Sequence, residues 1–137
     1  MVKYRRKDMK NGIIYQIFPD RFFIGNGKNI EDKRELYHKE AVLKQWDEKI
    51  EKENMHYHFF GGDIFGIIEK LEYIKERGAD WIYINPVFPA TTYHRYDAVD
   101  YKNIDENLGG MESFELLIKT AHEMGVKVVI DIALNHL

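Results

Sequence analysis

The chain has 137 residues, of which 45% are hydrophobic and 14% aromatic, the composition of a folded, water-soluble domain. Its net charge of −3 is spread over mixed acidic and basic residues, which excludes a single-sign field for nucleic acid or anionic lipid. We therefore predict neither a nucleic-acid nor a membrane partner. The absence of cysteine excludes disulfides, thiolate metal sites and a cysteine nucleophile.

The N-terminal stretch is basic at residues 3–7, and we interpret this cluster as a solvated, frayed terminus. The largely apolar run that follows, residues 13–18, is shorter than the hydrophobic region of a secretory signal, which has roughly 7–15 residues. We expect no signal peptide and a cytoplasmic location.

The first two elements are predicted from their apolar spacing. Residues 13–18 are β-branched and aromatic and are closed by Pro19, as expected of a buried strand. From Ile64 onward the apolar residues recur on one helical face, with Asp63 as a plausible N-cap and Gly78 as a left-handed cap. This order predicts a strand followed by a helix.

The remaining elements repeat this order. A second strand is predicted at 81–84, a helix at 114–124 and a third strand at 126–134. Strands that are apolar on both faces and joined by helices imply an α/β fold with a parallel sheet. No repeat or linker divides the chain, so we predict one structural piece. Residues 31–58 stay open between two alternatives, a long surface loop and a helix with one apolar face formed by Val42, Trp46 and Ile50.

Polar residues collect where the predicted strands end. The first strand is followed by Asp20 and Arg21, the second by Asn85 and a long loop that contains Tyr93, His94, Arg95, Tyr96 and Asp97, and the third by Asp131, Asn135 and His136. An aspartate within an apolar strand needs a partner, for which we expect an arginine or backbone amides. In parallel α/β folds, binding groups lie at the carboxyl ends of the strands. Taken singly, each of these residues could have a structural role instead. Taken together, at adjacent strand ends, they predict a binding site.

The residue types at these strand ends favour a neutral ligand rich in hydroxyl groups. An aromatic ring covers the C–H face of a sugar, while amide, imidazole and carboxylate groups bind its hydroxyls. The glycine-rich stretch "GGDIFG" at 61–66 opens a helix but lacks the Walker lysine and the dinucleotide spacing. The sequence therefore predicts sugar binding rather than phosphate binding.

Four segments in order resemble the alpha-amylase superfamily of glycoside hydrolases: "IIYQIFPDRF", "FFGGDIFGIIEKLEYIKERGADWIYINPVF", "YHRYDAVDYKNIDENLGG" and "VKVVIDIALNH". The third is most similar to the neopullulanase and cyclomaltodextrinase branch. The resemblance covers residues 12–136 and implies a (β/α)₈ TIM barrel that hydrolyses or transfers α-1,4 or α-1,6 glucosidic bonds of starch, maltodextrin or cyclodextrin with retention.

The resemblance also implies that residues 1–137 are only the N-terminal βαβαβ portion of the catalytic barrel, which needs about 250 residues. The family's nucleophile and proton donor lie on the fourth and fifth strands, and no acid of this chain matches either. We expect the chain alone to be inactive. The alternative is a non-catalytic module for sugar binding or protein contact.

The resemblance assigns supporting roles to residues of the third and fourth segments. Tyr96 matches a tyrosine that stacks on the sugar, and Asp97 lies beside it. Asp131 matches an aspartate that braces the site, and His136 a histidine that binds a sugar hydroxymethyl group. Asn135 matches an asparagine that steadies the loop and, in some members, binds calcium.

The resemblance further implies a calcium loop after the first strand. Asn26, Asn29, Gly61 and Asp63 match its oxygen ligands. Isoleucine stands at positions 24 and 30, where polar ligands are expected, and calcium needs six or more oxygens. The sequence leaves two alternatives, a calcium site or a simple helix cap at Asp63.

An incomplete barrel also carries an expectation about partners besides α-glucan oligosaccharides. Its outer strands have unpaired edges, and we predict that Ile17, Ile84 and Ile130 face the barrel interior and are partly uncovered. We therefore expect self-association, or association with the missing part of the barrel.

Overall fold

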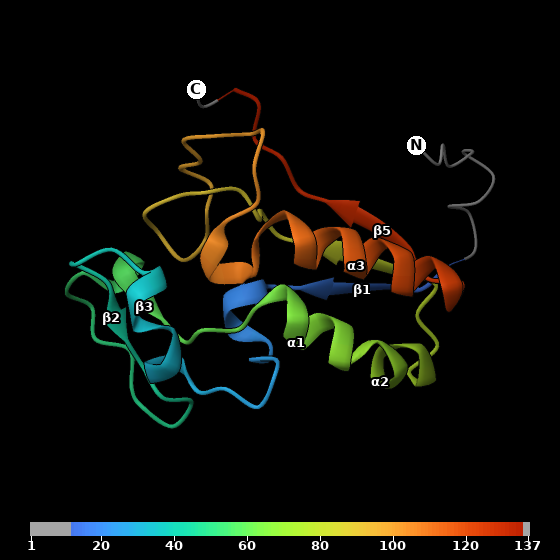
Figure 1. Ribbon diagram of the computed structural model, residues 1–137, viewed down its shortest axis with the longest axis horizontal. Helices are drawn as coiled ribbons and strands as arrows, with labels where there is room; N and C mark the ends of the chain where they lie inside the picture. Colours follow the sequence, from blue (N-terminus) through green and yellow to red (C-terminus); the bar gives the residue numbers. More distant parts are fainter. Residues whose placement is uncertain (1–11, 136–137) are drawn as a thin grey trace.

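The computed structural model describes residues 12–135, which form a parallel sheet of three strands covered by helices (Figure 1). The strands are β1 (Ile14–Ile17), β4 (Trp81–Ile84) and β5 (Lys127–Ile130), in the order β1-β4-β5. Both pairings are parallel. The helices are α1 (Ile64–Glu69), α2 (Leu71–Glu76) and α3 (Gly110–Glu123). The predicted α/β class and the βαβαβ order are confirmed.

The hydrophobic core lies between the sheet and the three helices. Ile82 and Ile84 of β4 are fully buried against Ile67 of α1 and Leu117 of α3. Figure 1 shows α1, α2 and α3 running alongside the sheet. Burial of each such aliphatic side chain contributes about 1.5–3 kcal/mol to the free energy of folding, so this layer is the main source of hydrophobic stabilisation. No helix of residues 12–135 is long and apolar enough to cross a membrane.

The helical segment after Asp63 begins as predicted but is divided in two. Oδ1 of Asp63 accepts a hydrogen bond from the Gly66 amide at 2.8 Å, so Asp63 is the N-cap of α1. Lys70, with φ −101° and ψ 5°, separates α1 from α2. Gly78 closes α2 with φ +85°, a left-handed conformation that glycine adopts without strain. A single helix was predicted here, and that part of the prediction is wrong.

The outer strands differ from the prediction in burial and length. Strand β1 is an edge strand that pairs with β4 alone. Ile13, just before it, and Ile14 are 57% and 56% exposed, and Ile14 shares the face of Gln16, which the helices do not cover. The predicted buried strand at 13–18 is therefore a half-exposed edge strand. β5 ends at Ile130, and the segment 131–134 leaves the sheet, although the strand was predicted to continue to 134.

The face assignment of the strand residues is corrected by the structure. Ile17 and Ile84 lie in one register row with Ile130, and this row faces the helices rather than the barrel interior. Ile17 and Ile84 are 1% and 0% exposed, not partly uncovered. Because successive side chains alternate between faces, Gln16 and Tyr83 point to the opposite, inner face.

Residues 31–58 form a separate lobe, and the predicted amphipathic helix is absent there. The lobe contains two short parallel strands, β2 (Val42–Leu43) and β3 (His58–Phe59), and 3₁₀ helices at Ile30–Leu36 and Met55–Tyr57. Val42, Trp46 and Ile50 are 38%, 51% and 47% exposed, so the surface-loop alternative is nearer to the structure. The lobe lies beyond the carboxyl end of β1 (Figure 1). Two further 3₁₀ turns occur at Pro19–Arg21 and Glu106–Leu108.

Candidate functional site

A chain of hydrogen bonds joins polar side chains across the three strands. Nε2 of Gln16 donates to Oδ1 of Asn85 at 3.0 Å, and Nδ2 of Asn85 donates to the Tyr96 hydroxyl at 3.2 Å. The Tyr96 hydroxyl in turn donates to Oδ2 of Asp131 at 2.5 Å. We call Gln16, Asn85, Tyr96 and Asp131 the strand-end network.

The parallel register explains why these residues meet. Asn85 directly follows β4 and Asp131 directly follows β5, and the two strands are paired in register up to these positions. Tyr96 reaches Asp131 from the loop between β4 and α3. The sequence predicts an arginine or backbone amides as the partner of the Asp131 side chain. This prediction is wrong, because the carboxylate accepts a hydrogen bond from the phenol of Tyr96. Since Asp131 is only half-buried, water also contributes to its solvation.

The Asp131 carboxylate disfavours ionisation of nearby phenols. The hydrogen bond to Asp131, together with burial and the negative charge, raises the pKa of Tyr96 to about 12. Burial, followed by a hydrogen bond to Asp131, also raises the pKa of Tyr83. Both hydroxyl groups are protonated at neutral pH, as those of unperturbed tyrosines are, and the raised pKa values keep them protonated at higher pH as well.

The ring of Tyr96 is accessible from solvent. Tyr96 is 37% exposed, and its ring lies 5.8 Å from the ring of His94 at an interplanar angle of 31°. Nδ1 of His94 accepts the Tyr96 backbone N–H at 3.1 Å, and burial lowers the pKa of His94, which favours the neutral imidazole needed for this role. The arrangement gives an oriented aromatic face beside amide and carboxylate groups.

Asp97, the neighbour of Tyr96, is engaged within its own loop. Its carboxylate accepts hydrogen bonds from the Thr91 amide at 3.2 Å, the Thr91 hydroxyl at 2.8 Å and the Thr92 hydroxyl. Burial alone would raise the pKa of Asp97, but the hydrogen bonds from Thr92 and Thr91 outweigh burial and lower it. Asp97 therefore closes the loop that presents Tyr96.

Arg95 anchors the same loop from its buried side, a role that was not predicted from the sequence. The side chain is 1% exposed and the backbone has φ +58°. Its guanidinium donates to Asp105 Oδ2 at 3.1 Å, to Asn107 Oδ1 at 2.5 Å and to the Tyr93 carbonyl at 2.8 Å. The only sequence signal is an arginine between the histidine and tyrosine of "HRYD". Arg95 is a positioning residue because it fixes the turn before Tyr96.

Of the last two predicted sugar-binding residues, only Asn135 belongs to the described part of the chain. Asn135 is exposed in the turn that follows β5. His136 lies outside the described residues 12–135, so its predicted contact with a sugar stays a prediction. The basic cluster at 3–7 also lies outside them.

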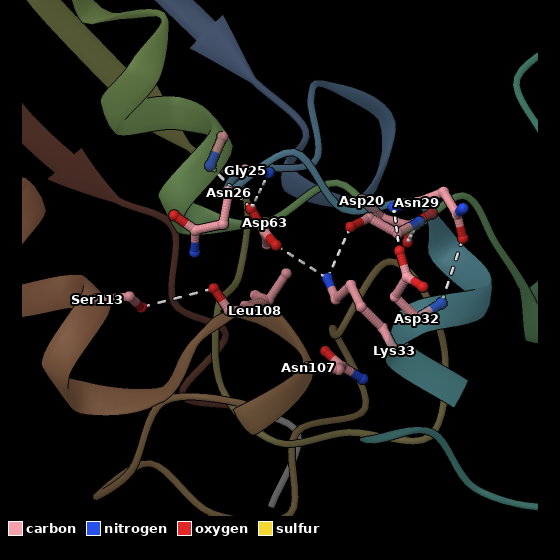
Figure 2. A network of polar contacts seen from close by, with 12 residues as sticks. Asp20, Gly25, Asn26, Asn29, Asp32, Lys33, Asp63, Asn107, Leu108 and Ser113 are labelled. Carbon is pink, nitrogen blue, oxygen red and sulfur yellow. Dashed lines mark hydrogen bonds and ion pairs between the residues drawn. The ribbon is translucent and has the colours of Figure 1, made fainter. Parts of the chain in front are cut away.

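The residues that match a calcium loop surround a lysine. Nζ of Lys33 donates to the Gly61 carbonyl at 2.7 Å and to Oδ2 of Asp63 at 3.1 Å (Figure 2). Lys33 and Asp63 are each 4% exposed. Burial lowers the pKa of Lys33, while the charge of Asp63 opposes this shift. We call Lys33, Gly61, Asp63 and Asp20 the loop-anchoring network.

Asp20 completes this network from the end of β1. It is fully buried, and its carboxylate accepts the backbone N–H groups of Phe60, at 3.0 Å, and Gly61, at 3.1 Å. The side chain of Arg21 donates to Asp20 at 2.8 Å. Asp20 therefore holds the irregular segment that connects β3 to α1.

The two asparagines of the proposed calcium loop also have local roles. Oδ1 of Asn29 accepts the backbone N–H groups of Glu31 and Asp32 and so caps the 3₁₀ helix Ile30–Leu36. Asn26 has φ +61°, and its N–H donates to Oε1 of Glu69 at 2.9 Å. With an ammonium group between Gly61 and Asp63, these residues do not fit a calcium ion. Within residues 12–135, no group of three or more His, Asp or Glu side chains is arranged to hold a metal.

A parallel βαβαβ sheet with polar groups at the carboxyl ends of its strands is typical of α/β-barrel proteins, whose binding sites lie at that face. The family model of the alpha-amylase catalytic domain matches residues 16–137, and the chain belongs to this family. The chain is thus the N-terminal βαβαβ portion of a (β/α)₈ barrel that its three strands do not close.

The similar proteins include an amylopullulanase from Thermoanaerobacter thermohydrosulfuricus, 40% identical over 93% of this chain, and neopullulanase 2 from Thermoactinomyces vulgaris, 35% identical over 93%. The solved type III pullulan hydrolase from Thermococcus kodakarensis matches 88% of the chain with a TM-score of 0.75 and 37% identity. The chain spans 10% and 20% of the length of the first two proteins and 23% of the third. The predicted family and branch are confirmed.

Proposed function

We propose that this chain is the N-terminal part of a retaining glycosidase that hydrolyses or transfers α-1,4 or α-1,6 glucosidic bonds of an α-glucan. In this proposal the chain supplies part of the sugar-binding surface, and the nucleophile and proton donor lie outside it. The observation that carries the proposal is the strand-end network with the exposed Tyr96 ring. Similarity to proteins named for pullulan supports the substrate class.

The network suits a sugar because its polar groups are oriented before a ligand arrives. Asp131 and Asn85 hold the Tyr96 hydroxyl from two sides, which leaves the ring face free to stack on a sugar. Asn135 and His136 follow the same strand end and are the proposed partners for sugar hydroxyls. A pre-oriented ring loses little conformational entropy on binding.

The contacts of the carboxylates near the site support the proposal that the chain alone is inactive. A retaining glycosidase needs two carboxyl groups about 5 Å apart on either side of the scissile bond. Asp131 is bonded to Tyr96, Asp97 to two threonines, and Asp20 is buried beneath the loop. None of the three is placed as a free nucleophile or proton donor.

The activity proposal is tested by incubating the chain with pullulan, maltodextrin and cyclodextrin and measuring reducing-sugar release. We expect no release above the blank, because the two catalytic carboxyl groups are supplied elsewhere. Release that disappears in Asp131→Asn would show that a catalytic carboxylate lies within the chain and would refute this part of the proposal.

The binding proposal is tested by titrating the chain with maltotetraose and β-cyclodextrin in NMR or calorimetry. Tyr96→Ala should lose stacking worth on the order of 1 kcal/mol, whereas Tyr96→Phe keeps the ring and most of the affinity. Tyr73→Ala on α2 is the matched control, since Tyr73 is a similarly exposed tyrosine far along the helix layer. Equal affinity of Tyr96→Ala and the unaltered chain would exclude Tyr96 as the sugar platform.

A second candidate function, protein contact, is favoured by the open edges of the sheet. β1 and β5 each have one neighbour, and Ile13 and Ile14 are more than half exposed beside β1. We propose that these edges bind the remaining part of the barrel or, failing that, a second copy. Sedimentation velocity over a range of concentrations tests this: a monomer at high concentration with one sharp unfolding transition contradicts it.

A further inference from the structure

Lys33 is 4% exposed, and its amine lies between two acceptors from another segment of the chain. It projects from the 3₁₀ helix Ile30–Leu36 to the Gly61 carbonyl and to Oδ2 of Asp63, 28 and 30 residues away in sequence. Figure 2 shows this side chain spanning from its own helix to Asp63. A single positive group thus joins the lobe to the segment that enters α1.

Asp63 extends this junction to a third segment. Its other oxygen, Oδ1, accepts the Gly25 amide at 3.0 Å and the Gly66 amide at 2.8 Å. One carboxylate therefore connects the loop after β1, the first turn of α1 and the lysine. In the absence of a cation, Asp63 would be a buried negative charge with only backbone N–H partners.

The surroundings suit an ammonium group better than a calcium ion. Calcium needs six or more oxygens, whereas an ammonium has three donors and a flexible carbon stem that packs against apolar groups. Ile24 and Ile30 flank the site and are 8% and 1% exposed, so they offer carbon surface instead of ligands. Oδ1 of Asn29 is already occupied by its helix cap.

We propose that the Lys33 ammonium group is a built-in cation that takes the place of a calcium ion and ties the loop after β1 and the lobe to the start of α1. The consequence is that this junction needs no metal. Its stability depends on the pairing of Lys33 with Asp63 and not on chelator or calcium concentration.

The first experiment uses the unaltered full chain and needs no variant. Thermal unfolding is followed by circular dichroism in excess EDTA, in calcium and in magnesium at equal ionic strength. We expect the same Tm in all three, because a ligand that binds only the folded state would raise it. A Tm that rises in calcium but not in magnesium overturns the proposal.

The second experiment is a double-mutant cycle on Lys33→Met and Asp63→Asn. Lys33→Met should lower Tm by roughly 10 °C or more, because it leaves a buried carboxylate without its cation. Asp63→Asn keeps a good N-cap residue, so it should lower Tm in the unaltered chain but raise it in Lys33→Met. This reversal of sign is expected only if the two charges act as a pair.

Lys28→Met is the matched control, since Lys28 is an exposed lysine in the neighbouring loop, and its Tm should not change. Additive effects of the two substitutions would overturn the proposal, because they would show that Lys33 and Asp63 act independently. If Lys33→Met fails to fold, rescue of folding by the added Asp63→Asn supports the pairing. If both fail to fold, the calcium titration of the unaltered chain decides.

Discussion

The two polar networks of this chain differ in their access to water. In the loop-anchoring network, Asp20, Lys33 and Asp63 are 0%, 4% and 4% exposed. In the strand-end network, the Tyr96 ring is 37% exposed and Gln16 and Asp131 also reach solvent. The first network is closed, and the second is open at each of its members except Asn85, which is 6% exposed.

The difference shows how polar residues divide into structural and ligand-binding roles. A buried charge must be satisfied by the protein itself, because leaving it unpaired costs several kcal/mol. Such a network fixes the course of the chain but has no capacity left for a ligand. An accessible network is already solvated, so a sugar can replace its water at small cost.

The largest loss of stability is expected from Asp20→Ala in the closed network. The substitution leaves the buried amides of Phe60 and Gly61 without an acceptor and Arg21 without its ion partner. We expect a loss of about 3–5 kcal/mol in the free energy of unfolding, measured by urea denaturation. Asp47→Ala, at an exposed position of the lobe, serves as control and should change it little.

A loss of less than about 1 kcal/mol in Asp20→Ala would mean that water replaces the carboxylate, and the network would not be closed as the geometry indicates.

A smaller effect is expected from Asn29→Ala, which removes the cap of the 3₁₀ helix Ile30–Leu36. The expected cost is about 1 kcal/mol in the free energy of unfolding, and Asn29→Asp should keep most of the stability. Because the role is a cap, the loss should be equal in EDTA and in calcium. A loss seen only in calcium would instead identify Asn29 as a metal ligand.

Gln16→Ala tests the open network and should leave stability within about 0.5 kcal/mol, since Gln16 is exposed. The Asn85 amide then loses the donor that orients it toward Tyr96, so affinity for maltotetraose should fall by no more than about twofold. Gln45→Ala, another exposed glutamine, is the control for calorimetric titration. A loss of stability without loss of affinity would place Gln16 among the structural residues.

The smallest effect on stability is expected from Asp97→Asn, and it should depend on pH. The pKa of this carboxyl is lowered in the folded chain, so its ionised form contributes stability above the unfolded pKa, which is lost as pH falls through the folded pKa. Asp97→Asn should be slightly less stable than the unaltered chain at neutral pH, and this difference should shrink below about pH 4. Tm measured against pH, with Asp47→Asn as control, gives the comparison.

If the difference in Tm between Asp97→Asn and the unaltered chain does not change with pH, Asp97 acts by its shape rather than by its charge.

The regular elements were predictable because their signals are local. The helical spacing from Ile64, the cap at Asp63 and the left-handed Gly78 depend on residues within a few turns of one another. The boundaries were less predictable: Lys70 interrupts the helix, and β5 ends four residues early. The choice of strand face was wrong at Ile17 and Ile84, because an apolar strand carries no alternation to reveal it.

The candidate site was predictable as a location but not as a set of contacts. Parallel strands bring their carboxyl ends to one edge, so Asn85, Tyr96 and Asp131 were expected to be near one another. Their pairing was not, since the Tyr96 hydroxyl meets a carboxylate 35 residues away. The positioning role of Arg95 was not predicted, because no local pattern shows that its guanidinium is buried against Asp105. Gln16 was missed because its partner, Asn85, follows another strand.

The sequence by itself determined the α/β order of elements, the strand ends that carry polar residues and, through its motifs, the family. Only the tertiary structure decided which of these polar groups are closed and which are open. Lys33 lies among charged neighbours and is typical of a solvated helix face, yet folding buries its amine against Gly61 and Asp63. The physical reason is that burial is a property of packing between distant segments, and no local pattern of charges records it.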